Sequence, residues 1–280
     1  MSPLFQYLRS ELSAAFEARE ARALAFVILE DGFGISATDV YAGKVRHFSE
    51  EERQRLAFIL QRTLAGEPVQ YVLGRAEFDG RTFEVNPAVL IPRPETEELV
   101  AWVAADAAST AGKIHLLDAG TGSGCIAVSL ALRLPGVRTE AWDLSPEALE
   151  TARRNAGRHG ADVDFRLNDI LHPEGESLFD IIVSNPPYVC RSERTDMEPQ
   201  VLLHEPETAL FVPDEDPLLF YRALAALARR RLRTGGAVYM ELNRHFGHET
   251  QDLFRREGFG QTELRRDLFG NERMLKAVKD

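Results

Sequence analysis

The stretch that decides the fold is residues 114–124, which read Ile-His-Leu-Leu-Asp-Ala-Gly-Thr-Gly-Ser-Gly. Residues 114–118 form a short apolar run, which is typical of a buried strand. The three glycines that follow let the backbone turn tightly and bring its N–H groups against a ligand. A helix is expected from Cys125, and the N-terminus of a helix favours negative charge. This strand-to-helix turn therefore predicts a ligand site.

Two other glycine-rich motifs compete for this stretch, and the spacing excludes both. The dinucleotide fingerprint G-x-G-x-x-G needs glycine at the position of Cys125. The phosphate-binding P-loop needs Lys followed by Ser or Thr after its glycines, and no such pair follows here.

From about residue 95 onward, strand and helix patterns alternate. Strands are expected at 114–118, 138–143, 163–167, 179–184 and 237–242, with shorter ones near 261–265 and 273–278. Helices are expected at 124–133, 145–158, 217–232 and 247–257. Regular alternation of this kind predicts an α/β fold, with a parallel sheet covered by helices on both faces.

The first 75 residues have a different pattern, because their apolar residues recur at helical spacings. Ser49 followed by three glutamates is a capping box at the start of one helix. Residues 76–90 alternate like a hairpin, with Asp79-Gly80 as its turn. We therefore expect a helical-bundle domain at 1–75, a β-hairpin connector at 76–92 and the α/β domain at 93–280.

Polar side chains follow the second and third expected strands. Asp143 stands about 20 residues past the glycine turn, where an acid accepts hydrogen bonds from ribose hydroxyls. Its alternative role is a helix cap, but Ser145 already supplies that start. Asn168-Asp169-Ile170 can accept from an adenine amine and pack against its ring; alternatively, Asp169 caps the loop before His172. Together with the glycine turn, these sites predict a nucleoside pocket at one edge of the sheet.

Asn185-Pro186-Pro187-Tyr188 follows the fourth expected strand. Neither proline supplies an N–H to a ladder, so the chain leaves the sheet at the carboxyl end of the strand, where ligands bind in open α/β sheets. The Asn185 side-chain carbonyl and the Pro186 backbone carbonyl are acceptors, and Tyr188 adds an aromatic face. This combination suits a planar NH2 group of an amide or a nucleobase. The alternative is a proline-rich turn in which Asn185 caps its own backbone.

Composition narrows the class of protein. The 280 residues carry 33 basic and 44 acidic side chains, a net charge of −11, which argues against duplex nucleic acid as the main partner. The two cysteines, Cys125 and Cys190, make no disulfide framework and are expected to be buried packing residues. Neither a signal peptide nor a transmembrane stretch is evident, and no metal-ligand spacing appears. We expect a cytoplasmic protein without a bound metal.

The glycine turn, Asp143 and the Asn-Pro-Pro-Tyr loop together resemble S-adenosylmethionine-dependent amino-methyltransferases. Segments outside that shared core narrow the resemblance to the bacterial release factor glutamine methyltransferases. These segments are residues 66–74, 89–97, 204–210 and 266–273. The resemblance extends over nearly the whole chain.

The resemblance implies a Rossmann-like seven-stranded methyltransferase sheet behind a small helical domain and a β-hairpin connector. The implied reaction moves a methyl group from S-adenosylmethionine, leaving S-adenosylhomocysteine, to the N5 amide nitrogen of a glutamine. That glutamine lies in the Gly-Gly-Gln loop of class I peptide chain release factors, which the helical domain docks. We expect a monomer that binds neither membrane nor nucleic acid directly.

The family's functional residues map onto matching positions of this chain. The implied cofactor-binding residues are Gly120, Thr121, Gly122, Ser123, Gly124, Asp143, Asp169, Ile170 and Asn185. The implied substrate loop is Asn185, Pro186, Pro187 and Tyr188, with Asn185, Pro186 and Tyr188 as catalytic residues. The chain departs from the family pattern in two places. Ile170 stands where relatives often have an aromatic residue, and Glu241-Leu242-Asn243 stands where they often carry glycine.

Three other functions fit part of the pattern. In a DNA adenine-N6 methyltransferase, the adenine amine would present the same two hydrogens to the loop. Such an enzyme, however, usually carries a basic recognition region. A binding module that has lost its chemistry would not need an intact glycine turn, Asp143 and the four-residue loop. A nicotinamide oxidoreductase would need the missing glycine and a proton donor beside the loop.

Overall fold

The computed structural model describes residues 1–108 and 112–280. Contacts divide the chain into two compact units. We call residues 1–75 and 198–204 the helical unit, and residues 76–197 and 205–280 the sheet unit. None of the described helices is long and apolar enough to cross a lipid bilayer.

The helical unit is built from amphipathic helices whose apolar faces share one core, which includes Phe5, Leu8, Ile28 and Leu60. The expected capping box at Ser49 is present, because its side chain accepts from the Glu52 N–H at 3.1 Å and its own N–H donates back to the Glu52 carboxylate at 2.9 Å. The helices are α1 (Pro3–Leu12), α2 (Ala18–Phe33), α3 (Ala37–Tyr41), α4 (Glu50–Leu64), α5 (Val69–Leu73) and α9 (Pro199–His204).

The predicted hairpin is formed by β1 (Arg75–Phe78) and β2 (Arg81–Glu84). Both residues of its turn have positive φ, 54° at Asp79 and 67° at Gly80. This is the conformation that a two-residue turn requires if it is to follow the twist of its strands. The Asp79 N–H also donates to Glu97 Oε1 at 3.0 Å, which ties the turn to the first helix of the sheet unit.

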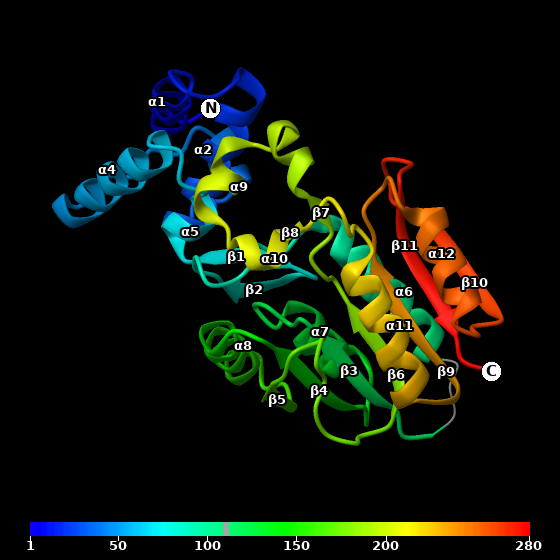
Figure 1. Cartoon of the computed structure of the whole chain (residues 1–280). Coiled ribbons are helices and arrows are strands. Elements are labelled where there is room, and N and C mark those ends of the chain that lie inside the picture. Colours follow the sequence, from blue (N-terminus) through cyan, green and yellow to red (C-terminus); the bar gives the residue numbers. More distant parts are fainter. Residues whose placement is uncertain (109–111) are drawn as a thin grey trace. The chain divides into compact units, whose positions relative to one another are not determined.

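The sheet unit contains a seven-stranded sheet within the described residues, in the order β10-β11-β9-β6-β3-β4-β5 (Figure 1). Its strands are β3 (His115–Ala119), β4 (Arg138–Asp143), β5 (Val163–Leu167), β6 (Phe179–Ser184), β9 (Leu232–Glu241), β10 (Gln261–Arg266) and β11 (Glu272–Val278). The connecting helices are α6 (Pro94–Ala107), α7 (Cys125–Arg133), α8 (Pro146–His159), α11 (Leu219–Arg231) and α12 (Gly247–Arg256). All seven predicted strands are confirmed.

The sheet is parallel as predicted except at one strand. β11 is antiparallel to both of its neighbours, β9 and β10, whereas the pairs from β9 through β5 are parallel. The connection from β10 to β11 is too short for a crossover helix, so β11 can only fold back. β9 also begins at Leu232, earlier than expected, because the Gly235-Gly236 pair lies inside the strand rather than before it.

Alternation along the strands creates two cores, one on each face of the sheet. Leu116 and Val183 pack with α6 and α7 on one face. Leu117 and Ile182 face the other way and pack with α11 and α12. Helices on both faces leave the carboxyl ends of the parallel strands as an open edge, which is where every predicted site residue lies.

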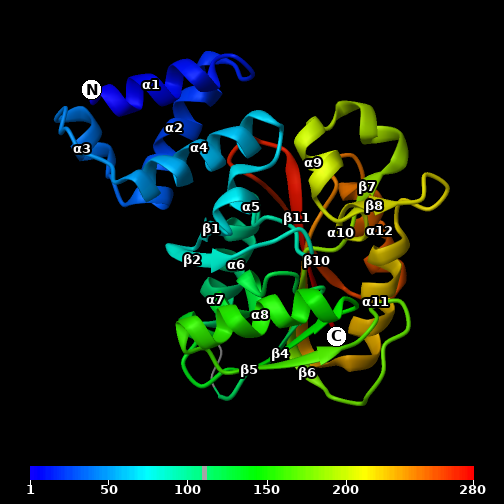
Figure 2. The same ribbon diagram turned by 90° about the vertical axis from the view of Figure 1, so that its left-hand side faces the viewer.

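Four shorter elements, all of them absent from the sequence-based prediction, follow the Asn-Pro-Pro-Tyr loop. β7 (Val189–Cys190) pairs in parallel with β8 (Phe211–Val212), and the two elements lie near one another in both views (Figure 2). The 3₁₀ helix η1 (Arg191–Asp196) and α10 (Glu207–Leu210) lie between these strands in the sequence. The paired strands keep the chain after Tyr188 close to the sheet edge.

Candidate functional site

The glycine turn connects β3 to α7 and is held by hydrogen bonds from its own backbone. The N–H groups of Gly120 and Thr121 both donate to the Trp142 carbonyl, at 2.9 and 2.8 Å, and the Gly124 N–H donates to the Thr121 carbonyl at 2.8 Å. The Gly122 N–H donates to Asp143 Oδ2 at 2.8 Å. These four N–H groups therefore stabilise the turn itself. Of the two expected roles of the glycine turn, turning the backbone tightly and directing N–H groups at a ligand, the first is the one observed.

Asp143 lies at the end of β4, opposite the turn. Its Oδ2 accepts from Gly122 and its Oδ1 accepts from the Ser145 N–H at 2.9 Å. Burial raises the pKa of this carboxyl, and the backbone hydrogen bonds oppose that rise. A carboxylate has about four acceptor positions, so Asp143 retains capacity for ribose hydroxyls. Ser145 provides the cap of α8, as expected, because its Oγ accepts from the Ala148 N–H at 3.1 Å.

Asp169 and Ile170 follow β5 and differ in what they offer. Asp169 Oδ1 accepts from the Leu171 N–H at 2.8 Å, and Oδ2 lies 3.0 Å from His172 Nδ1. These are the contacts of a loop cap, the alternative left open above, and a contact with adenine stays a prediction. Ile170 is buried, and a Cβ at Gly120 would lie 3.5 Å from its Cδ1. Ile170 is therefore an apolar wall beside the glycine turn.

The Asn185-Pro186-Pro187-Tyr188 loop leaves the sheet at the end of β6, as the prolines predict. The Ser184 hydroxyl donates to the Ala119 carbonyl at 2.6 Å, so the loop starts beside the glycine turn. Asn185 Nδ2 donates to Thr96 Oγ1 at 3.1 Å. Among the described residues, no hydrogen bond reaches Asn185 Oδ1 or the Pro186 carbonyl, the two acceptors expected to bind substrate.

Tyr188 is held at both its ring and its backbone. Its hydroxyl donates to Glu241 Oε1 at 2.8 Å, and its carbonyl accepts from Asn243 Nδ2 at 3.0 Å. Burial and the neighbouring Glu241 charge raise the pKa of the Tyr188 hydroxyl well above its usual range, so it stays protonated. Asn243 Nδ2 also donates to Glu193 Oε2 at 2.8 Å. Glu241 and Asn243, at and just after the end of β9, thus hold the loop in place through Tyr188.

Glu241 is a residue of the site whose contacts the sequence did not reveal. It is 2% exposed, and its Oε2 accepts from Thr96 Oγ1 at 2.7 Å. Burial raises the pKa of this carboxyl, while the two hydroxyl donors and the Arg273 charge oppose the rise. A glutamate directly after the apolar run 237–240 was the available signal, because buried acids are rare unless they are paired.

Of the segments that carried the family resemblance, residues 89–97, 205–210 and 266–273 lie in the sheet unit, and residues 66–74 lie in the helical unit. Glu205 is buried; it accepts from the Ile91 N–H at 3.2 Å and pairs with Arg93. Asp267 is also buried and accepts from the N–H groups of Phe269 and Asn271, both at 2.9 Å. These acids fix the loops that surround the sheet edge.

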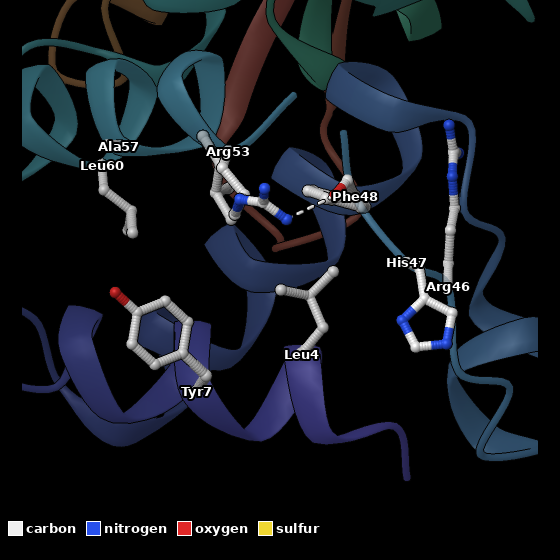
Figure 3. Close-up of a pocket in the computed structure, with 9 residues that line it drawn as sticks. Leu4, Tyr7, Arg46, His47, Phe48, Arg53, Ala57 and Leu60 are labelled. Atoms are coloured by element: carbon white, nitrogen blue, oxygen red, sulfur yellow. Dashed lines mark hydrogen bonds between the residues drawn. The ribbon is translucent and has the colours of Figure 1, made fainter. Parts of the chain in front are cut away.

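The two cysteines are free and buried, as expected. Burial raises the pKa of Cys125 to about 12 and that of Cys190 to about 11, so neither is a reactive thiolate. Within the described residues, no cluster of three His, Cys, Asp or Glu side chains is arranged to hold a metal ion. A pocket of about 430 Å³ in the helical unit, lined by Tyr7, His47 and Arg53 among others, contains none of the predicted site residues (Figure 3).

Two family models match the chain. The PrmC N-terminal domain matches residues 4–74 and the methyltransferase small domain matches residues 100–212. A release factor glutamine methyltransferase from Bacteroides thetaiotaomicron is 44% identical over 279 residues, covering 99% of each chain. Another from Flavobacterium psychrophilum is 40% identical over 268 residues, covering 95% of this chain and 94% of its own.

Solved structures share the fold. The T. thermophilus 16S rRNA N2 G1207 methyltransferase RsmC, in complex with AdoMet and guanosine, has a TM-score of 0.54 at 19% identity and covers 74% of this chain and 50% of its own. A methyltransferase from Pyrococcus furiosus has a TM-score of 0.54 at 18% identity, and the match covers 82% of this chain and 99% of its own. At these identities the likeness concerns the fold alone, and it confirms the predicted Rossmann-like sheet.

Proposed function

The chain belongs to the family of release factor glutamine methyltransferases, and from that premise we propose that it transfers a methyl group from S-adenosylmethionine to the side-chain amide nitrogen of a release factor glutamine. The substrate glutamine is the one in the Gly-Gly-Gln loop of class I release factors. The observation that carries the proposal is a pair of acceptors that receive no hydrogen bond from the described residues, Asn185 Oδ1 and the Pro186 carbonyl, in the loop that also holds Tyr188.

The sheet edge fits the cofactor. The residues that would hold it are the glycine turn of residues 120–124, Asp143 at the ribose and Ile170 beside the base. Asp143 retains acceptor capacity, and Ile170 supplies apolar surface next to Gly120. S-adenosylmethionine supplies a methyl group on a positively charged sulfur and leaves as S-adenosylhomocysteine.

The chemical difficulty lies in the amide, whose nitrogen lone pair is delocalised into the carbonyl. Asn185 Oδ1 and the Pro186 carbonyl accept the two amide hydrogens, which orients the nitrogen and increases its electron density. Tyr188 stacks on the amide plane. Most of the acceleration then comes from positioning and electrostatics. One amide hydrogen leaves as a proton after the nitrogen is methylated, so no strong base is needed.

The helical unit serves as the second contact surface for the release factor. Several of its large apolar side chains are at least half exposed, among them Tyr41, Val45, Phe58 and Leu203. These side chains are available for contact with a protein partner. We place the enzyme in the cytoplasm as a monomer that contacts a protein rather than nucleic acid or membrane. The relatives are named release factor glutamine methyltransferases, so they do not support the alternative of DNA adenine methylation.

The test is methyl transfer from labelled S-adenosylmethionine to purified class I release factor, with a Gln→Ala variant of its Gly-Gly-Gln loop as control. We expect label on the wild-type factor and none on the variant. Asn185→Ala should abolish transfer while the cofactor still binds. Equal labelling of both factors, or labelling of DNA instead, would contradict the proposal.

A further inference from the structure

Three elements of the sheet unit meet at the Asn185 side chain. Asn185 follows β6, Thr96 lies in the first turn of α6, and Glu241 is the last residue of β9. Asn185 Nδ2 donates to Thr96 Oγ1 at 3.1 Å, and Thr96 Oγ1 donates to Glu241 Oε2 at 2.7 Å. Thr96 and Glu241 are each 2% exposed, so water does not compete for these contacts.

The direction of these hydrogen bonds determines which end of the amide faces outward. A threonine hydroxyl has one hydrogen and can otherwise only accept. The Glu241 carboxylate accepts that hydrogen, so Thr96 Oγ1 presents lone pairs to Asn185. Only the NH2 end of the Asn185 amide can face those lone pairs. Its Oδ1 must therefore face the other way, where no described residue donates to it.

Glu241 acts on the substrate loop through its other oxygen as well. Glu241 Oε1 accepts from the Tyr188 hydroxyl at 2.8 Å. One buried carboxylate thus holds Tyr188 directly and Asn185 through Thr96. Its own position is set by the sheet, because Glu241 pairs with Met274 of β11. A rigid scaffold behind the first contacts is what keeps a site in its productive geometry.

We propose that Thr96 and Glu241 are positioning residues that lock the orientation of the Asn185 amide, with Oδ1 toward the substrate. The proposal rests on the proposed function in assigning Asn185 Oδ1 to the substrate amide. An unlocked amide can rotate by 180° and place a donor where the substrate nitrogen needs an acceptor. The proposal therefore predicts a loss in the catalytic step rather than in cofactor affinity.

Thr96→Val tests the proposal because it keeps the shape and removes the hydroxyl. We expect kcat for the release factor to fall at least about tenfold, with a smaller change in KM and an unchanged Kd for S-adenosylmethionine. Thr96→Ser restores the hydroxyl and should stay within about threefold of wild type. Glu241→Gln leaves one oxygen for two hydroxyl donors and should also lower kcat.

Thr139→Val is the matched control. Thr139 is 3% exposed and lies in the same unit, but its hydroxyl has no partner among the described residues. This substitution should leave kcat unchanged. A Thr96→Val enzyme with wild-type kcat would overturn the proposal, as would an equal loss in Thr139→Val. A wild-type kcat in Glu241→Gln would overturn the role of the carboxylate.

A second measurement separates this proposal from the proposed function. The second measurement needs the 15N signals of the Asn185 side-chain NH2 group, which are assigned as the pair that disappears from the spectrum of Asn185→Ala. We expect its hydrogens to exchange with solvent at least about tenfold faster in Thr96→Val than in wild type, and at the wild-type rate in Thr96→Ser. If the wild type fails to methylate a release factor, the proposed function is wrong, and the exchange rates still decide the orientation. Unchanged exchange in Thr96→Val contradicts the lock.

Discussion

At the residue scale, Asp118 is the buried side chain that fixes the glycine turn to the start of α7. Its side chain is fully buried at the end of β3. Oδ2 accepts from Thr121 Oγ1 at 2.6 Å and from the Ala127 N–H at 3.1 Å, which ties the turn to the first turn of α7. Oδ1 has no hydrogen-bond partner among the described residues. Burial raises the pKa of Asp118 to about 7, against the effect of these two donors.

This raised pKa makes stability depend on pH. The folded state binds the Asp118 proton more tightly than the unfolded state, so stability is lost as pH rises from about 4 through about 7. Between pH 6 and pH 8 the free energy of unfolding should fall by about 1 kcal/mol from this group. Asp118→Asn cannot ionise and should lack that part of the fall. Urea unfolding of both proteins at several pH values checks this, and equal slopes would contradict the assignment.

Residues in local motifs could be predicted from the sequence, and residues that act across the fold could not. The position of Asn185 at a sheet edge follows from the strand and prolines beside it. Thr96 is 89 residues from Asn185 and 145 residues from Glu241, so no spacing rule connects the three. Their hydrogen bonds exist only because β6 and β9 end, and α6 begins, at the same edge. The loop-cap contacts of Asp169 likewise depended on a loop path that the sequence left open.

At the element scale, the packing of α7 against α8 depends on Gly124. Gly124 precedes α7 with φ of 82°, a conformation that side chains disfavour. A Cβ there would lie 3.0 Å from the Ala152 Cβ and 3.2 Å from its Cα, both in α8. A backbone atom cannot rotate away as a long side chain does. The glycine therefore permits both the turn and the close approach of two helices.

Gly124→Ala should lower the free energy of unfolding by about 2–4 kcal/mol, because left-handed strain and overpacking add together. Gly160→Ala is the matched control. It also has positive φ, 67°, but a Cβ there meets nothing within 4 Å. The control should lose only about 1 kcal/mol, from backbone strain alone. Urea unfolding of both variants without cofactor measures the difference, and equal losses would show that the approach of Ala152 does not matter.

Elements with strong periodicity and clear ends could be predicted, as the boundaries of β4, β5 and β6 illustrate. The reversed direction of β11 could not, because alternation alone does not distinguish a crossover from a short return. β7 and β8 are two residues each, too short for any period. α5 follows directly after a proline and ends at a glycine, so its five residues resemble a connection rather than a helix.

At the scale of the whole molecule, we assign release factor docking to the helical unit, and cofactor binding and methyl transfer to the sheet unit. Each unit has its own core. Every residue assigned to cofactor or substrate amide lies in the sheet unit, and the helical unit has its own cluster of buried side chains. Residues 198–204 join the helical unit although the chain on either side belongs to the sheet unit. No shift in composition marks that change, so the sequence did not reveal it. The separation makes substrate docking and cofactor binding independently measurable.

Identical truncations in the two cores should therefore have different effects. Leu29 lies in α2 and Leu224 in α11, and both are fully buried. Leucine-to-alanine changes at such sites cost about 2–5 kcal/mol. Leu29→Ala should raise KM for the release factor and leave the Kd for S-adenosylmethionine unchanged, because the cofactor residues belong to the other core. Leu224→Ala should weaken cofactor binding, since Leu224 shares a core with Ala119 and Ile170, which adjoin the glycine turn. Calorimetric titration with cofactor and steady-state kinetics with release factor give the two numbers. If Leu29→Ala weakened cofactor binding as much as Leu224→Ala, the helical unit would be a support of the catalytic fold rather than a docking surface.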